Sequence, residues 1–109
     1  MKVSQETKGS ASLFIVEGQV DMHTSPELRR HLRGALDQRA DPVVADLSGV
    51  SFIDSSGLAT LIEALQGVAR YGGKLRLVGL APAVKNLFQL SNLTSIFDIR
   101  DSRDEALEA

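Results

Sequence analysis

Cysteine is absent from this 109-residue chain, which excludes a disulfide framework, a thiolate nucleophile and a Cys-based metal site. Long apolar runs are absent as well, and no stretch approaches the ~20 residues that a transmembrane helix needs. The first seven residues, MKVSQET, lack the apolar core of a secretory signal. We therefore expect a cytoplasmic protein with no membrane partner.

An excess of charge of one sign is also missing. The net charge is only −2, so the chain offers no basic surface for nucleic acid or an anionic membrane. There is neither a Walker loop nor a Gly-x-Gly-x-x-Gly segment, so no nucleotide cofactor is expected. His23 and His31 lack the spacing of metal ligands on one helix face, so no metal is expected either. The length and an apolar content of 43% predict a single domain over residues 1–109 with a modest core.

The most informative stretch is a junction between a strand and a helix. Val43–Leu47 is typical of a buried strand, and apolar residues at helical spacing from Leu58 onward predict a helix that begins near Ser56. Asp54, Ser55 and Ser56 therefore lie among helix-capping residue types, where unpaired amides and the helix dipole favour an anion. Two adjacent hydroxyls at such a point are accessible to chemistry. The simplest alternative is that the cluster only caps the helix and that Gly57 only allows close packing.

The rest of the chain alternates strands with helices, which predicts an α/β fold with a largely parallel sheet. A helix begins at Thr24, because Thr24 and Glu27 have the spacing of a capping box and Pro26 suits the first turn. It ends near Arg39–Pro42. Residues 1–9 are polar and form either an edge strand or a loose arm. The other expected elements are strands at Leu13–Val16, Leu75–Leu80 and Ile96–Ile99, a loop or short strand at Gln19–His23, and helices at Leu58–Tyr71, Pro82–Leu90 and Ser102–Leu107.

Four segments together resemble one protein family. Phe52–Leu58 (FIDSSGL) is similar to the phosphorylation motif of the bacterial anti-sigma factor antagonists, or anti-anti-sigma factors, which are single STAS domains. Gly18–Thr24 is similar to the family's Gly-x-x-Asp segment before its first helix, and Gly72–Val78 and Ala81–Phe88 resemble its later strand and helix. The resemblance implies a single STAS domain over residues 1–109. It also implies a mixed, mostly parallel sheet with helices packed mainly on one face.

The resemblance assigns roles to individual residues. Ser55, directly after Asp54, matches the serine that is phosphorylated in this family. Asp21 matches an acidic position that lies near the phosphorylation site and contributes to partner contact. The partner-binding set implied in this way is Asp21, Thr24, Asp54, Ser56 and Gly57. On the residues alone, Asp21 is more simply a solvated loop carboxylate.

The function implied by the resemblance is that of a binding module without catalytic residues. The unphosphorylated form of such proteins binds an anti-sigma factor, which is also a serine kinase that uses ATP and Mg²⁺, and this binding releases a sigma factor. Phosphorylation ends the interaction, and a serine phosphatase restores it. A phosphate adds about −1.5 to −2 charge at neutral pH, so we expect a local switch at an interface with little refolding.

Two alternatives stay open at this point. A STAS subunit of another assembly, such as a lipid-transport or stressosome complex, would have the same fold. A small serine hydrolase would use Ser55 as its nucleophile with His23 or His31 as its base. The segment around Ser55 is not Gly-x-Ser-x-Gly and no oxyanion loop is evident, so hydrolysis is the weaker hypothesis.

Overall fold

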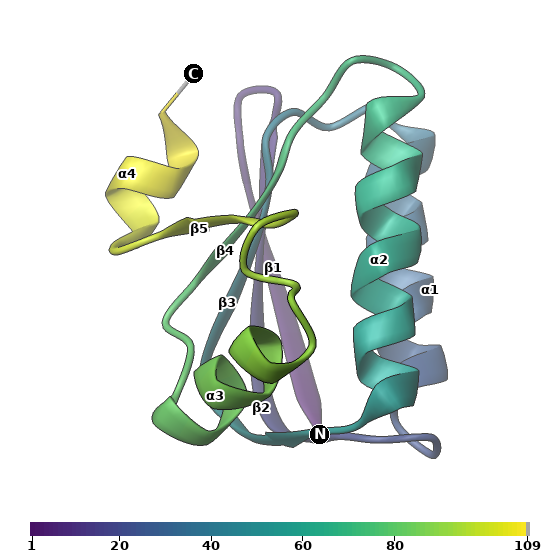
Figure 1. Ribbon diagram of the computed structural model, residues 1–109. Coiled ribbons are helices and arrows are strands. Elements are labelled where there is room, and N and C mark those ends of the chain that lie inside the picture. The colour runs from purple at the N-terminus through teal and green to yellow at the C-terminus, as the bar shows by residue number, and fades with distance from the viewer. Residues whose placement is uncertain (109) are drawn as a thin grey trace.

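A five-stranded sheet in the order β1-β2-β3-β4-β5 forms the centre of the computed structural model, which describes residues 1–108 (Figure 1). Strand β1 is antiparallel to β2, and the remaining neighbours are parallel. The elements in chain order are β1 (Lys2–Lys8), β2 (Ala11–Val20), α1 (Ser25–Asp37), β3 (Val43–Ile53), α2 (Ser55–Ala69), β4 (Leu75–Val78), α3 (Pro82–Leu90), β5 (Asp98–Arg100) and α4 (Arg103–Leu107).

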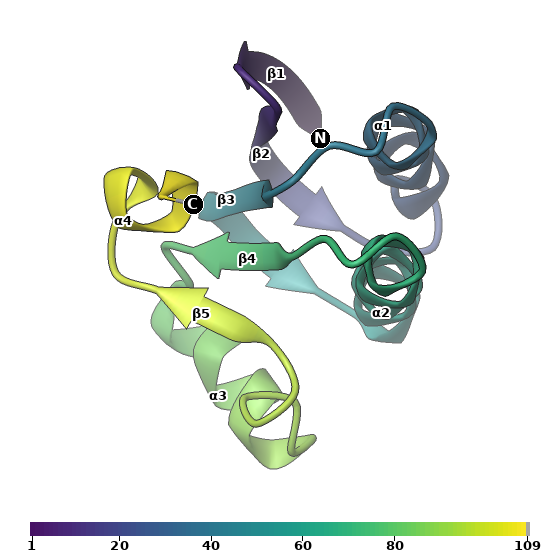
Figure 2. The same ribbon diagram turned by 90° about the horizontal axis from the view of Figure 1, so that it is seen from above.

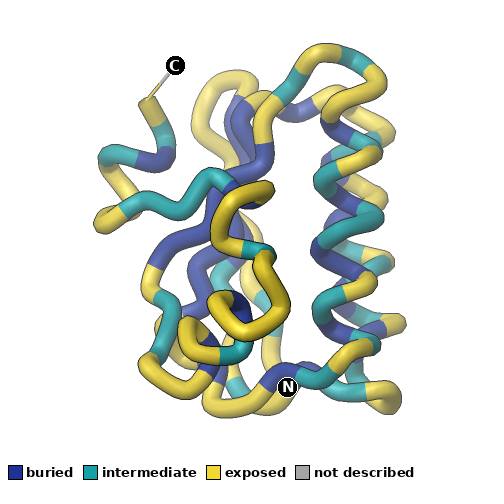
Figure 3. The backbone as a smooth tube through the Cα atoms, viewed as in Figure 1, coloured by how far each residue is buried: buried dark blue, intermediate teal, exposed yellow. Residues whose placement is uncertain are grey.

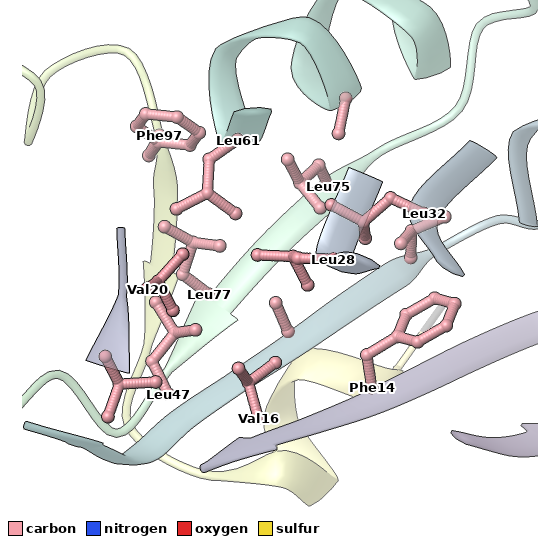
Figure 4. Packing of buried hydrophobic residues seen from close by; sticks show 14 of the residues in the cluster. Phe14, Val16, Val20, Leu28, Leu32, Leu47, Leu61, Leu75, Leu77 and Phe97 are labelled. Atoms are coloured by element: carbon pink, nitrogen blue, oxygen red, sulfur yellow. The ribbon is translucent and has the colours of Figure 1, made fainter. Parts of the chain in front are cut away.

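The helices cover the two faces of the sheet unequally. Helices α1 and α2 lie side by side on one face, and α4 lies on the other (Figures 1 and 2). The larger core fills the space between the sheet and the α1–α2 layer, and it includes Phe14, Leu28, Leu61 and Leu77 (Figure 4). Helix α3 adds its own buried residues to this core, whereas α4 covers a small second cluster through Ala106. The predicted fold, with helices mainly on one face, is confirmed.

Strands β2 and β3 are longer than the sequence patterns predicted. Strand β3 continues without a break from Val43 to Ile53, and β2 continues to Val20. The exposed pair Ser48-Gly49, which resembles a turn in sequence, lies inside β3. A Cβ at Gly49 would lie only 2.8 Å from Cγ of Glu17 on β2, so glycine allows the two backbones to pair closely there. As a result, both strands reach the edge of the sheet where the candidate residues lie.

Other boundaries differ from the predictions by a few residues. Helix α2 begins at Ser55 and ends at Ala69, and β4 ends at Val78. The last strand comprises Asp98–Arg100 instead of Ile96–Ile99. The shift arises because Phe97 is buried against Phe88, with 5.6 Å between the ring centroids, and the turn that brings it there leaves Ile96 half exposed.

Residues 2–8, for which the sequence left a strand or a loose arm open, form the edge strand β1. Its residues pair one by one with β2, from Lys2 opposite Glu17 to Lys8 opposite Ala11. Most of β1 is exposed, in contrast to the buried central strands (Figure 3).

Candidate functional site

The candidate residues come together because two parallel strands end side by side. Val20, the last residue of β2, is paired with Ile53, the last residue of β3. The backbone N–H of Asp54 donates to the carbonyl of Val20 over 3.1 Å, which ties the two chain exits to each other. The loop that starts at Asp21 and the start of α2 therefore lie side by side at the carboxyl ends of β2 and β3, which form the edge of the sheet that carries the site.

Asp54 is the N-cap of α2. Its Oδ1 accepts hydrogen bonds from the backbone N–H groups of Ser56 at 2.9 Å and Gly57 at 3.2 Å. These two amides are among the first-turn donors that have no partner within a helix. The capping part of the sequence prediction is thus confirmed, with the helix beginning one residue earlier than expected.

The two serines after Asp54 differ in their surroundings. Ser55 is the first residue of α2 and is exposed, and its hydroxyl makes no hydrogen bond to any part of the chain within residues 1–108. Ser56 is half-buried, and its carbonyl accepts a hydrogen bond from the buried Thr60 hydroxyl over 3.0 Å. Ser55 therefore offers the more accessible oxygen to an enzyme that approaches from solvent.

Gly57 brings α2 close to the strand ends. It is buried, and a Cβ at this position would lie 2.5 Å from Cγ1 of Ile53 and 2.9 Å from Cγ1 of Val20. No side chain fits in this space without displacing its neighbours. The glycine thus sets the distance between the first turn of α2 and the sheet, and with it the position of Ser55.

The loop from Asp21 to Thr24 is closed by reciprocal hydrogen bonds. Asp21 Oδ1 accepts from the backbone N–H groups of His23 at 2.9 Å and Thr24 at 3.1 Å. The Thr24 hydroxyl accepts from the N–H of Asp21 and donates to the carbonyl of Gln19, both over 2.9 Å. The predicted capping box of Thr24 and Glu27 is wrong, because this hydroxyl is engaged with the preceding loop and does not cap α1.

Comparison with known proteins places this geometry in a family. The profile of the STAS domain matches residues 2–106. The chain belongs to the STAS domain family.

Individual STAS relatives are regulators. The anti-sigma-B factor antagonist of Bacillus subtilis is 33% identical over 84 residues, which cover 77% of this chain and 76% of the relative. The crystal structure of an anti-sigma factor antagonist from Mycobacterium paratuberculosis has a TM-score of 0.87 and 27% identity, and the match covers 97% of this chain and 90% of the other. The phosphorylated form of the Bacillus cell fate determinant SpoIIAA shares the fold, with a TM-score of 0.76, 21% identity, and coverage of 97% and 96%. The family and fold are those of anti-sigma factor antagonists and not of known enzymes.

The STAS site carries negative charge beside Ser55. The hydrogen bond from the His23 N–H lowers the pKa of Asp21 below its ordinary value, and burial opposes this shift only in part. All its backbone bonds go to Oδ1, so Oδ2 has no hydrogen-bond partner within residues 1–108. The carboxylate of Asp54 lies one residue before Ser55. A further negative group on Ser55 would therefore join two carboxylates at one edge of the STAS domain.

The two histidines are not arranged around Ser55. His23 is exposed, and its backbone N–H is used in the Asp21 loop. His31 lies within α1 and packs edge-on against Phe14, with ring centroids 6.4 Å apart. Neither imidazole is hydrogen-bonded to Ser55 in residues 1–108. The geometry thus lends no support to a Ser-His pair of the hydrolase type.

An apolar surface that the sequence patterns did not predict lies next to the site. A groove of about 310 Å³ separates the end of β3 from α3, and Phe52, Leu87 and Leu90 are among its lining residues. Phe52 is 49% exposed and Leu90 is 76% exposed. Phe52 lies only three residues before Ser55, and this closeness in sequence was the one available signal.

Within residues 1–108 no helix is both long and apolar enough to cross a membrane.

Proposed function

We propose that this STAS domain is a cytoplasmic anti-sigma factor antagonist whose binding is switched off by phosphorylation of Ser55. The unphosphorylated form binds an anti-sigma factor, which thereby releases its sigma factor. The anti-sigma factor is also a serine kinase that uses ATP and Mg²⁺, and a serine phosphatase reverses the modification. The observation that carries the proposal is the exposed, unengaged hydroxyl of Ser55 at the start of α2, in a chain whose relatives are antagonists of anti-sigma factors.

The chemistry needs little from the STAS domain itself. The kinase transfers the γ-phosphoryl group of ATP to Oγ of Ser55, so that an O–P bond forms, the bond to ADP breaks, and the hydroxyl proton passes to the kinase's base. Ser55 Oγ can be approached without unfolding, because its residue is exposed and its hydroxyl is not used elsewhere in residues 1–108. The phosphate would sit at a helix N-terminus, which favours an anion, so the fold would tolerate it.

The effect on the partner is electrostatic. The proposed contact surface is the edge formed by Asp21, Asp54 and Ser56, with Thr24 and Gly57 setting its shape. Phosphorylation adds about −1.5 to −2 charge to this surface, and bulk where a hydroxyl had been. A partner surface that is complementary to a neutral hydroxyl loses both its fit and its charge balance. The switch is therefore local and leaves the domain folded.

Site mapping with the cognate kinase tests the proposal. The domain is incubated with the kinase, ATP and Mg²⁺, and the modified residue is identified by mass spectrometry. We expect one phosphate on Ser55, none on Ser55→Ala, and undiminished labelling of Ser56→Ala as the matched control. Labelling that persists in Ser55→Ala, or that is lost in Ser56→Ala, would contradict the assignment.

Capture of partners from the native cytoplasm separates this function from its same-fold alternative. An anti-sigma factor with kinase activity on the unphosphorylated domain supports the proposal. Subunits of a lipid transporter or a stressosome in its place would assign the domain to another assembly. A serine-reactive phosphonate that labels Ser55 would point to hydrolase chemistry and would overturn the proposal.

A further inference from the structure

Strand β1 offers an open edge. It lies at one end of the sheet order, and no other strand within residues 1–108 pairs with its outer side. Six of its seven residues are exposed, and only Val3 is half-buried. In Figure 2 it lies away from α3 and α4, at the far end of the sheet from β5. The backbone N–H and C=O groups along such an edge are a template for another strand.

We propose that β1 pairs antiparallel with β1 of a second copy, about a two-fold axis that passes Ser4. The two five-stranded sheets then form one continuous sheet across the interface. The partner is this same chain, and the surface is the outer edge of Lys2–Glu6. The proposal does not depend on the function of Ser55.

Symmetry restricts the possible registers. A two-fold axis perpendicular to a sheet leaves every side chain on its own face, and paired residues in a sheet share a face. The residue at the axis must therefore face its own copy. For a strand of seven residues, this leaves a small set of registers that can be compared by their charges.

Charge and the length of the overlap together select the register centred on Ser4. In it, Lys2 faces Glu6 of the partner subunit and Glu6 faces Lys2 of the partner subunit, so both pairs attract. In the register centred on Gln5, Lys2 of each copy would face Lys8 of the other, so two pairs of like charges would repel. In the register centred on Glu6, the two copies of Glu6 would face each other and repel. The Val3 register gains no ion pair. The Thr7 register also sets Glu6 opposite Lys8 twice, but it overlaps only the last three residues of β1.

Within one copy, Glu6 of β1 has no oppositely charged residue paired with it on β2. On β2, Lys2 already faces Glu17, but Glu6 faces the apolar Leu13. A second copy brings a lysine to the other side of Glu6. Lys8, a residue type that discourages edge pairing, lies outside the overlap of the Ser4 register.

The dimer would leave the candidate sites free. Lys2 is paired with Glu17 near the end of β2, so the site lies toward the Lys2 end of β1. Because the two β1 strands run in opposite directions, the two sites lie at opposite ends of the joined sheet. The dimer would therefore present Ser55 twice, and Ser55→Asp is expected to leave dimerisation unchanged.

Single-cysteine variants test the register directly, since the chain contains no cysteine of its own. Antiparallel neighbours are close enough for a disulfide only at paired positions. Under mild oxidation we expect Ser4→Cys to form a cross-linked dimer, and Gln5→Cys and Glu6→Cys to remain largely monomeric. Faster cross-linking at residue 5 or 6 than at residue 4 would overturn the proposed register.

Charge reversal provides the second test, by analytical ultracentrifugation over a range of concentrations. We expect the 11.7 kDa chain to double in mass as concentration rises. Glu6→Lys sets like charges opposite each other twice and should weaken the dimer about tenfold, and Lys2→Glu combined with Glu6→Lys should restore it. Lys8→Glu changes charge on the same strand outside the overlap and should have no such effect. A wild-type chain that is monomeric throughout, or a double variant that stays weak, would refute the proposal.

Discussion

Two strand-to-helix junctions meet at the same edge of the sheet, and they use similar residues in different ways. After β2, the carboxylate of Asp21 accepts bonds from two backbone N–H groups, and after β3, the carboxylate of Asp54 does the same. Each junction also carries a hydroxyl close by. The Thr24 hydroxyl bonds to the N–H of Asp21 in its own loop and to the carbonyl of Gln19 in β2, whereas the Ser55 hydroxyl has no partner within residues 1–108.

This difference between the two hydroxyls suggests a structural role for Thr24 and a chemical role for Ser55. A hydroxyl that holds two backbone groups cannot be modified without opening the loop, so the junction after β2 is suited to a fixed recognition surface. A free hydroxyl on a capped helix can be modified at little cost to the fold. The junction after β3 is therefore suited to a switch. Variants at the two junctions test this division of roles.

The largest effect is expected from charge at residue 55. Ser55→Asp places a negative group beside Asp54 and should weaken binding to the anti-sigma partner about a hundredfold, while the helix dipole keeps the domain stable. Ser55→Ala should bind as the wild type does and should resist being switched off. Titration of both variants against the partner measures this. Equal affinities for Ser55→Asp and Ser55→Ala would show that charge at residue 55 is not the switch.

Close packing under the second junction gives the next largest effect. Gly57→Ala places a methyl group against buried Ile53 and Val20 and should lower the free energy of unfolding by about 2 kcal/mol. Gly34→Ala is the matched control, because Gly34 also lies in a helix but has nothing within 4 Å of the added Cβ. That control should gain up to about 1 kcal/mol from helix propensity. Chemical denaturation of both variants decides the matter, and a neutral Gly57→Ala would remove the packing argument.

Local sequence patterns were sufficient for the second junction but not for the first. Asp54 caps α2 as its residue type and position indicate, because capping needs only the next three residues. Thr24 is also a capping residue type and lies three residues before Glu27, yet its hydroxyl donates to the carbonyl of Gln19. The end of β2 fixes the position of that carbonyl, and β2 extends so far only because it pairs with β3. Pairing between distant segments is not visible in a local pattern.

The same reason explains the continuity of β3. Ser48-Gly49 has the composition of a turn, and turn chemistry would end the strand there. The structure retains the strand because Gly49 fits against Glu17 and pairs with it on β2, whereas β4 pairs with β3 only over Val43–Asp46. The sequence predicted that both serine hydroxyls are accessible, but its local pattern did not predict that Ser55 is exposed and Ser56 half-buried, since exposure depends on the packing of neighbouring elements.

Charge at the first junction should affect the partner more than the fold. Asp21→Asn retains an Oδ1 acceptor for the N–H groups of His23 and Thr24, so stability should be almost unchanged. Loss of the carboxylate charge should weaken partner binding about tenfold at low salt and less at high salt. Asp21→Ala is the contrasting variant, because it removes both the charge and the turn. Unchanged affinity of Asp21→Asn at both salt concentrations would leave Asp21 as a solvated loop carboxylate.

The hydrogen-bonded hydroxyl of Thr24 should contribute to the stability of the fold, whereas the unpaired hydroxyl of Ser55 should not. Thr24→Val keeps the shape but leaves the N–H of Asp21 and the carbonyl of Gln19 without their partner, at a cost of about 1 kcal/mol. Thr24→Ser keeps the hydroxyl and should stay within about 0.5 kcal/mol of the wild type, as should Ser55→Ala. Thermal unfolding of the three variants compares the two hydroxyls. A larger loss in Ser55→Ala than in Thr24→Val would reverse the proposed division.

The smallest effect is a pH dependence of stability that belongs to the first junction. The backbone hydrogen bond from His23 lowers the pKa of Asp21 in the folded protein below its ordinary value of 3.8. The ionised carboxylate therefore stabilises the fold fully above pH 3.8, and this contribution is lost as the pH falls through the lower folded pKa. Asp21→Asn does not titrate, so its unfolding temperature relative to that of the wild type should be constant from neutral pH to about pH 5 and should rise as the pH falls below 3.8, where only the wild type loses this contribution. Ser55→Ala changes no titratable group and should differ from the wild type equally at every pH. A difference for Asp21→Asn that stays constant into strong acid would mean that the loop bonds do not favour the ionised carboxylate.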